Sequence, residues 1–171
     1  MSRKTLLPAL LVAVLAAFAT DGATVAEVRR PLGLSLDASA AKAPGGPPPV
    51  KLLRAWDARR AEAWARGDPA LLRSLYAPGS VAGRRDRAML RAWTARGLVV
   101  QGMDTQLLSV RELAHTPTTW TLQVTDRLVG GVAMGADLSR PLPHDQATTR
   151  IVRLTRLDGE WRVASVLPQD D

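Results

Sequence analysis

The sequence of 171 residues contains no cysteine. Disulfide bonds, thiolate metal sites, iron–sulfur clusters and cysteine nucleophiles are therefore excluded. Aromatic residues make up only 4% of the chain, and the sequence has no nucleophile elbow, no Walker A lysine and no metalloprotease motif. The length excludes a TIM barrel, whereas a hydrophobic fraction of 46% is enough to build the core of a single domain.

Lysine is rare as well, so arginine carries most of the formal net charge of +7. Proteins that bind single-stranded nucleic acid combine basic residues with aromatic stacking platforms. The single phenylalanine, Phe18, lies in an N-terminal apolar stretch, away from most of the basic residues. We therefore predict no nucleic-acid partner, and we interpret basic runs such as Arg59-Arg60 and Arg84–Arg87 as solvated helix surface.

Residues 1–19 have the pattern of a secretory signal peptide. Arg3 and Lys4 precede an apolar stretch from Leu6 to Ala19, which at about 14 residues is shorter than the ~20 that span a bilayer. Ala17-Phe18-Ala19 fits a cleavage site, and an uncleaved short membrane anchor is the alternative. Both interpretations predict an extracytoplasmic protein, secreted or associated with the envelope, that touches a membrane only through residues 1–19 if they remain.

Residues 20–49 are rich in Ala, Gly and Pro and show no hydrophobic period, which predicts a disordered linker. The folded domain is then expected over residues 50–171. Its first half has three helical patterns, over Val50–Arg66, from Pro69 to Tyr76, and from Val81 or Arg84 to Arg96.

Everything after Gly97 is typical of strands, with a slip in the alternation near Gly102. Asp158-Gly159 predicts a two-residue hairpin turn, and its register pairs Leu154 with Val163, Arg156 with Trp161 and Val152 with Ser165. The stretch Gly130–Ala147 is expected to be a long connection, either a gate or a floppy crossover. The fold class is therefore α+β: a cone-shaped, curved antiparallel sheet with three N-terminal helices packed on its concave face.

The chain resembles the nuclear-transport-factor-2-like superfamily, in particular its SnoaL-like branch of actinobacterial exported or envelope proteins. The resemblance covers about residues 51–167 and depends on Ala65–Asp68, Leu75–Ser80, Asp86–Leu90 and Asp158–Val163. It implies a cone fold that hosts isomerases, dehydratases and cyclases as well as many binding and dimerising modules.

Catalytic members of such cones place a carboxylate or histidine in an apolar pocket, where burial raises the pKa of a carboxyl group. Asp126 is the first candidate for a general base, because alternation places it on the apolar face with Leu128. The alternatives are that Asp126 forms a structural ion pair, for example with Arg156 or Arg87, that it lies at the solvated end of its strand, or that it contacts a ligand without catalysis. Tyr76 and His144 are further candidates for hydrogen bonding or acid–base chemistry, and Asp86 is interpreted as favouring the helix dipole.

The predicted ligand pocket is mostly aromatic and aliphatic, and the sequence predicts neither a metal site nor a cofactor. The leading hypothesis is a non-enzymatic binding or protein-interaction module at the cell envelope, whose partner is an apolar small molecule or an envelope protein. The alternatives are a ketosteroid-isomerase-like or cyclase-like enzyme with Asp126 as base, and a homodimerisation domain. The pocket residues are predicted to be Trp56, Tyr76, Trp93, Trp120, Leu122, Val124 and Trp161.

Overall fold

The computed structural model describes residues 48–169 of the chain. The predicted signal peptide or anchor (1–19) lies outside the described residues, as does the predicted linker except for its last two positions. No helix within the described range is long and apolar enough to cross a membrane.

Three helices open the domain, as predicted: α1 (Pro49–Arg66), α2 (Pro69–Ser74) and α3 (Val81–Thr94). Helix α1 ends at Gly67, which adopts the left-handed conformation at φ +63° that glycine tolerates best. The Asp68 carboxylate then accepts hydrogen bonds from the first free amides of α2, and the Ser80 hydroxyl does the same for α3. These local signals fix the end of α1 and the starts of α2 and α3.

Five antiparallel strands form one sheet in the order β1-β2-β4-β5, with β3 paired to the end of β2. Their bounds are β1 Val99–His115, β2 Thr119–Gly135, β3 Leu138–Pro141, β4 Thr148–Leu157 and β5 Glu160–Pro168. The predicted slip near Gly102 is confirmed, because the β1–β2 register shifts between Gln101 and Asp104 and Gly102 has φ +61°. Bulges of this kind bend a sheet.

The prediction of a long connection over Gly130–Ala147 was wrong. Strand β2 continues through the two glycines to Gly135, and a short turn returns the chain as β3, so that irregular backbone remains only at 142–147. Gly130 and Gly131 lower the apparent strand propensity, yet position 131 has φ +148°, which side-chain-bearing residues rarely adopt, and a Cβ there would lie 3.1 Å from Leu142 Cδ1.

The closing hairpin forms as predicted, with Leu154 opposite Val163 and Arg156 opposite Trp161. Asp158 and Gly159 both have positive φ, at 53° and 83°, as a type I′ turn requires. The predicted pairing of Val152 with Ser165 was wrong, because a bulge between Arg153 and Leu154 shifts the register and places Val166 opposite Val152.

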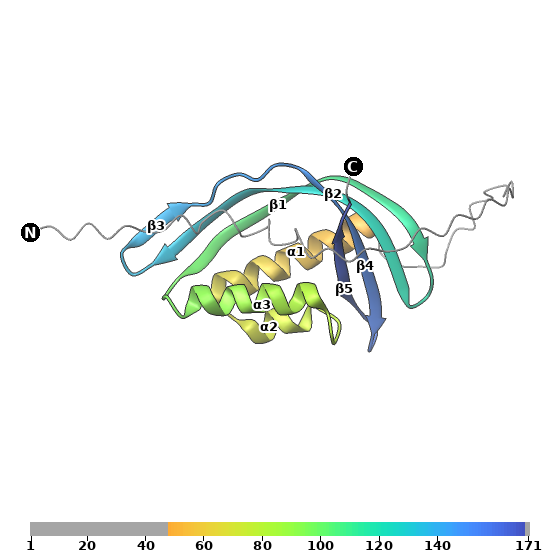
Figure 1. Ribbon diagram of the computed structural model, residues 1–171, viewed down its shortest axis with the longest axis horizontal. Helices are drawn as coiled ribbons and strands as arrows, with labels where there is room; N and C mark the ends of the chain where they lie inside the picture. Colours follow the sequence, from red (N-terminus) through yellow and green to blue (C-terminus); the bar gives the residue numbers. More distant parts are fainter. Residues whose placement is uncertain (1–47, 170–171) are drawn as a thin grey trace, which may run out of the picture.

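The three helices cover the concave face of the curved sheet, which arches over them in Figure 1. The predicted α+β cone fold is therefore confirmed. Its core is one continuous cluster in which Trp64, Leu72, Leu90 and Leu122 are fully buried.

Candidate functional site

A cavity lies between helices α1 and α3 and the concave face of the sheet. About 90 Å³ of it is open to the centre of a water molecule, which is room for several waters or the compact end of a ligand. Most of the wall is apolar, and the remainder is ionisable. The lining residues are Leu53, Trp56, Asp57, Arg60, Tyr76, Ala82, Arg85, Asp86, Met89, Thr105, Leu107, Val124, Asp126, Arg150, Val152, Val163 and Val166.

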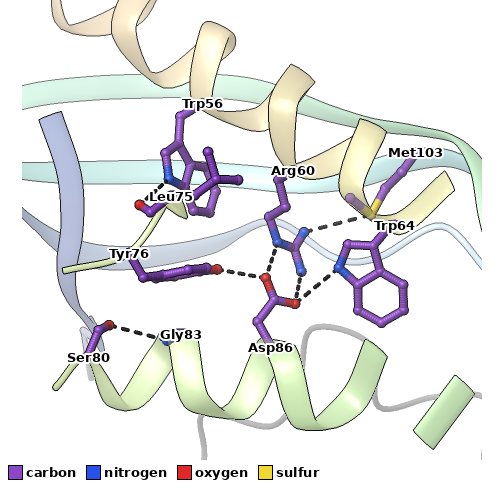
Figure 2. Close-up of polar contacts among 9 residues, drawn as sticks. All are labelled: Trp56, Arg60, Trp64, Leu75, Tyr76, Ser80, Gly83, Asp86 and Met103. Carbon is purple, nitrogen blue, oxygen red and sulfur yellow. Dashed lines mark hydrogen bonds and ion pairs between the residues drawn. The ribbon is translucent and has the colours of Figure 1, made fainter. Parts of the chain in front are cut away.

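Asp86 is the centre of a buried hydrogen-bond network on the helix side of this cavity (Figure 2). Its carboxylate accepts two hydrogen bonds from the Arg60 guanidinium, at 2.7 and 2.8 Å, in a bidentate pair. The Tyr76 hydroxyl donates at 2.7 Å and the Trp64 indole N–H at 3.2 Å. All four donors converge on one buried acid, so the network is fully satisfied and locks α1 onto α3.

Arg60 and Asp86 both remain charged because each stabilises the ionised form of the other. Burial alone would raise the pKa of Asp86, but the charge of the Arg60 guanidinium and the hydrogen bonds from Arg60, Tyr76 and Trp64 outweigh it and hold that pKa below its usual range. Burial and the Asp86 carboxylate together raise the pKa of Tyr76 far above its ordinary value. Tyr76 therefore remains a protonated hydrogen-bond donor to Asp86, and its hydroxyl is engaged inside the network.

Two interpretations of the sequence are corrected here. Arg60 is buried at 7% exposure and does not belong to a solvated surface. Asp86 is likewise 7% exposed, and the N-cap of α3 is Ser80, so Asp86 does not act as a helix-terminal charge. The signal was present in the spacing: Arg60 lies four residues from both Trp56 and Trp64, which places it on the apolar stripe of α1.

Asp126 forms an ion pair with Arg150 across the inner face of β2 and β4. The interior position predicted for Asp126 is correct in direction, since its side chain is 13% exposed. Its partner, however, is neither Arg156 nor Arg87. Strand β4 carries Arg150 on the same face as Val152 and Leu154, and the β2–β4 register sets it opposite Val124, two residues from Asp126. Alternation along β4 was the available signal for Arg150.

The residues predicted to form the ligand pocket divide into two groups. Trp56, Tyr76 and Val124 line the cavity. Trp93 instead packs edge-on against Trp64. Trp120 and Trp161 belong to an aromatic cluster at the far end of the sheet, where the His115 ring stacks on the Trp120 ring with 4.5 Å between centroids. Leu122 lies elsewhere in the core.

His144 lies on a second, open groove of about 870 Å³ rather than in the cavity. Arg54 and Arg127 are also part of its wall, so the groove is much more polar than the cavity. Asp57, Thr105 and Leu107 line both spaces. The groove therefore adjoins the cavity at these three residues.

Asp57 is the carboxylate that the sequence analysis missed. It is half-buried on α1 at the junction of cavity and groove, and it makes no hydrogen bond or ion pair to another residue of the described range. Burial raises the pKa of Asp57 to about 6; Arg60 and Arg150 oppose the rise, and Asp104 adds to it. Its position one helical turn from Leu53 and Arg60 marks it as part of the inward face.

The raised pKa of Asp57 predicts a pH-dependent cost to stability. The folded state retains the proton above pH 4 while the unfolded state releases it, so the free energy of unfolding should fall as pH rises from about 4 to about 6. Asp57→Asn should therefore be more stable than wild type at pH 7, by about 1–3 kcal/mol, with the difference vanishing below pH 4. Urea unfolding from pH 3 to 8 measures this, with exposed Glu62→Gln as control. Parallel wild-type and Asp57→Asn curves would show that Asp57 titrates normally.

Metal ligation has no geometric support within residues 48–169, where no group of three or more His, Cys, Asp or Glu residues is placed to hold a metal ion. Among the acidic residues of the cavity wall, Asp86 and Asp126 each form an ion pair with an arginine, and Asp57 forms none within the described range. The arrangement can instead hold a small molecule by apolar contact, donate hydrogen bonds from guanidinium groups, and exchange a proton at Asp57.

No protein-family model matches the chain, and no curated protein sequence matches it. Several solved structures are similar. The intermembrane space region of the chloroplast protein ARC6 matches with a TM-score of 0.50 at 12% identity, over 70% of this chain and 93% of that one. Aln2 from a Streptomyces species gives 0.48 at 14% identity, over 73% and 93%. A nuclear-transport-factor-2-like protein of unknown function from Shewanella oneidensis gives 0.45 at 11% identity, over 71% and 99%. At these identities the similarity concerns the fold alone.

Proposed function

Proceeding from a chain with the nuclear-transport-factor-2-like fold, we propose that this domain is a non-enzymatic binding module that holds a small, mainly apolar molecule inside its cone. The observation that carries the proposal is the cavity between α1, α3 and the sheet, whose wall is mostly apolar and which adjoins an open groove. A mostly apolar wall with a few polar groups at defined positions is typical of small-molecule sites, and the volume of about 90 Å³ suits the compact end of a ligand whose remainder lies in the groove. The signal-like pattern of residues 1–19 supports export of the domain to the envelope.

The pairing of the charged residues supports binding rather than catalysis. Arg60 is bound to Asp86, and Arg150 to Asp126, so four of the ionisable groups on the cavity wall already have partners. A base must be able to accept a proton from its substrate, and a carboxylate held by a guanidinium is poorly suited to do so. These pairs instead shape the cavity and set where a ligand's polar group can lie.

Native mass spectrometry of the protein from its producing cells tests the proposal. We expect a persistent adduct on the order of a few hundred daltons. If residues 1–19 have been removed, the polypeptide mass should match a chain that starts at Thr20. Val166→Trp, which fills the cavity, should lose the adduct, whereas Leu167→Trp on the exposed neighbour (57% exposed) should keep it. An adduct-free wild type, or equal adducts on both variants, would refute binding in the cone.

A second candidate function, acid–base catalysis, is favoured by Asp57 rather than by Asp126. Asp57 faces the cavity, has no hydrogen-bond partner in the described range, and is the one carboxyl group there whose pKa rises to about 6. If the domain converts its ligand, Asp57→Asn should accumulate the unreacted substrate and show an adduct mass different from that of wild type. Identical adducts on both proteins would favour the binding module.

A further inference from the structure

Arg150 has an unused hydrogen-bond donor on the wall of the cavity. One terminal nitrogen of its guanidinium binds Asp126, and the side chain as a whole is only 12% exposed. Its Nε is buried and has no hydrogen-bond partner. Among the buried side-chain nitrogen and oxygen atoms of residues 48–169, it alone lacks one. A buried donor without an acceptor is costly, and native proteins rarely retain one unless water or a ligand completes it.

The cavity offers one side from which an acceptor can approach Arg150. Arg150 lines the cavity beside Val124 and Val152, whose side chains offer no hydrogen-bonding atom. The Asp126 carboxylate is bound through one oxygen to a terminal nitrogen of the guanidinium and does not accept a hydrogen bond from Nε. Since Nε itself is covered, an acceptor in the cavity reaches the Nε–H only when the guanidinium turns toward the cavity.

The charges around Arg150 indicate an uncharged acceptor. The cavity wall carries three guanidinium groups, from Arg60, Arg85 and Arg150, against three carboxyl groups, from Asp57, Asp86 and Asp126. An added carboxylate would enter a site with no net positive charge and would lie close to existing acids, with desolvation as a further cost. A carbonyl or ether oxygen accepts the same hydrogen bond without bringing a charge.

We propose that the molecule bound in the cone is uncharged and presents an acceptor oxygen, such as a carbonyl, to the Nε–H of Arg150. The polar contact then lies on the sheet side of the cavity, at β4, and the apolar part of the ligand lies against Leu53, Trp56 and Met89 of the helices. Tyr76 takes no part, because its hydroxyl is committed to Asp86. This inference rests on the proposed binding function.

Three fluorinated probes of similar size and different polarity test it on the 171-residue chain: para-fluoroacetophenone, para-fluorocumene and para-fluorobenzoate. Fluorine NMR titrations give their affinities. We expect the ketone to bind about fivefold tighter than the hydrocarbon, the gain of one net hydrogen bond, and the carboxylate to bind weakest. Nitrogen–proton correlation spectra should show the Arg150 Nε–H resonance shifting with the ketone and not with the hydrocarbon.

Arg150→Lys keeps a cation for Asp126 and removes the Nε–H. It should abolish the ketone's advantage over para-fluorocumene, and exposed Arg153→Lys should keep that advantage. Equal binding of ketone and hydrocarbon without a shift of the Nε–H resonance would overturn the inference but leave cavity binding intact. Tightest binding of the carboxylate would also overturn it, and binding of none of the probes would count against the proposed function as well. If Arg150→Lys does not fold, the wild-type affinities and the Nε–H shift still decide.

Discussion

Replacing Asp86 with Ala is expected to lower the free energy of unfolding by about 3–5 kcal/mol, the usual cost of breaking a buried ion pair by removing one partner. The variant would leave the Arg60 guanidinium 7% exposed with only a weak contact from one nitrogen to the Met103 sulfur, at 3.7 Å. It would also leave the Tyr76 hydroxyl and the Trp64 indole N–H without their acceptor. Urea unfolding followed by tryptophan fluorescence measures the loss.

Two companion variants separate the pair from its surroundings. Glu62→Ala breaks the exposed pair with Arg66 on α1 and should cost only about 0.3–0.5 kcal/mol. The double variant Arg60→Met with Asp86→Leu replaces the charges by apolar groups of similar size and should recover much of the loss of Asp86→Ala. A loss below about 1 kcal/mol for Asp86→Ala would mean that water reaches Arg60 and that the network does not hold α1 onto α3.

The elements of this fold were predictable where their signals are local. The stop at Gly67, the cap at Asp68 and the turn at Asp158-Gly159 each depend on neighbours within a few residues, and all three occur in the structure. The errors arose where pairing overrides propensity. Gly130 and Gly131 continue β2 because β1 lies alongside, with Asp104 opposite Gly130, and a glycine pair alone gives no sign of that.

The site was harder to predict than the fold, because its pairs join elements that are distant in sequence. Arg60 and Asp86 are 26 residues apart and meet only once α1 packs against α3. Arg150 reaches Asp126 through the β2–β4 register. Helical spacing could place Arg60 on an inward face, but it could not identify the acid that neutralises it. Asp57 illustrates the same limit, since its environment depends on β1 residues such as Thr105 and Leu107.

Gly83→Ala is expected to destabilise the domain even though alanine is the better helix former. In an exposed helix this change would gain about 1 kcal/mol, yet a Cβ at position 83 would lie 2.5 Å from Tyr76 Cγ and 2.6 Å from Tyr76 Cβ. Those atoms belong to the base of the side chain, close to the backbone, and cannot swing aside like a flexible tip. Overpacking of this kind costs about 1–3 kcal/mol.

Tyr76 has no free direction in which to yield. Its ring packs edge-on against Trp56 at 5.4 Å, and its hydroxyl is bonded to Asp86 at 2.7 Å. A shift of the Tyr76 side chain away from position 83 would therefore disturb its packing on Trp56 or its hydrogen bond to Asp86. Ala88→Gly on the exposed side of α3 calibrates the helix propensity and should cost about 1 kcal/mol. If Gly83→Ala instead raises the urea midpoint, α3 can move away from Tyr76, and the interior of the cone is looser than its hydrogen bonds indicate.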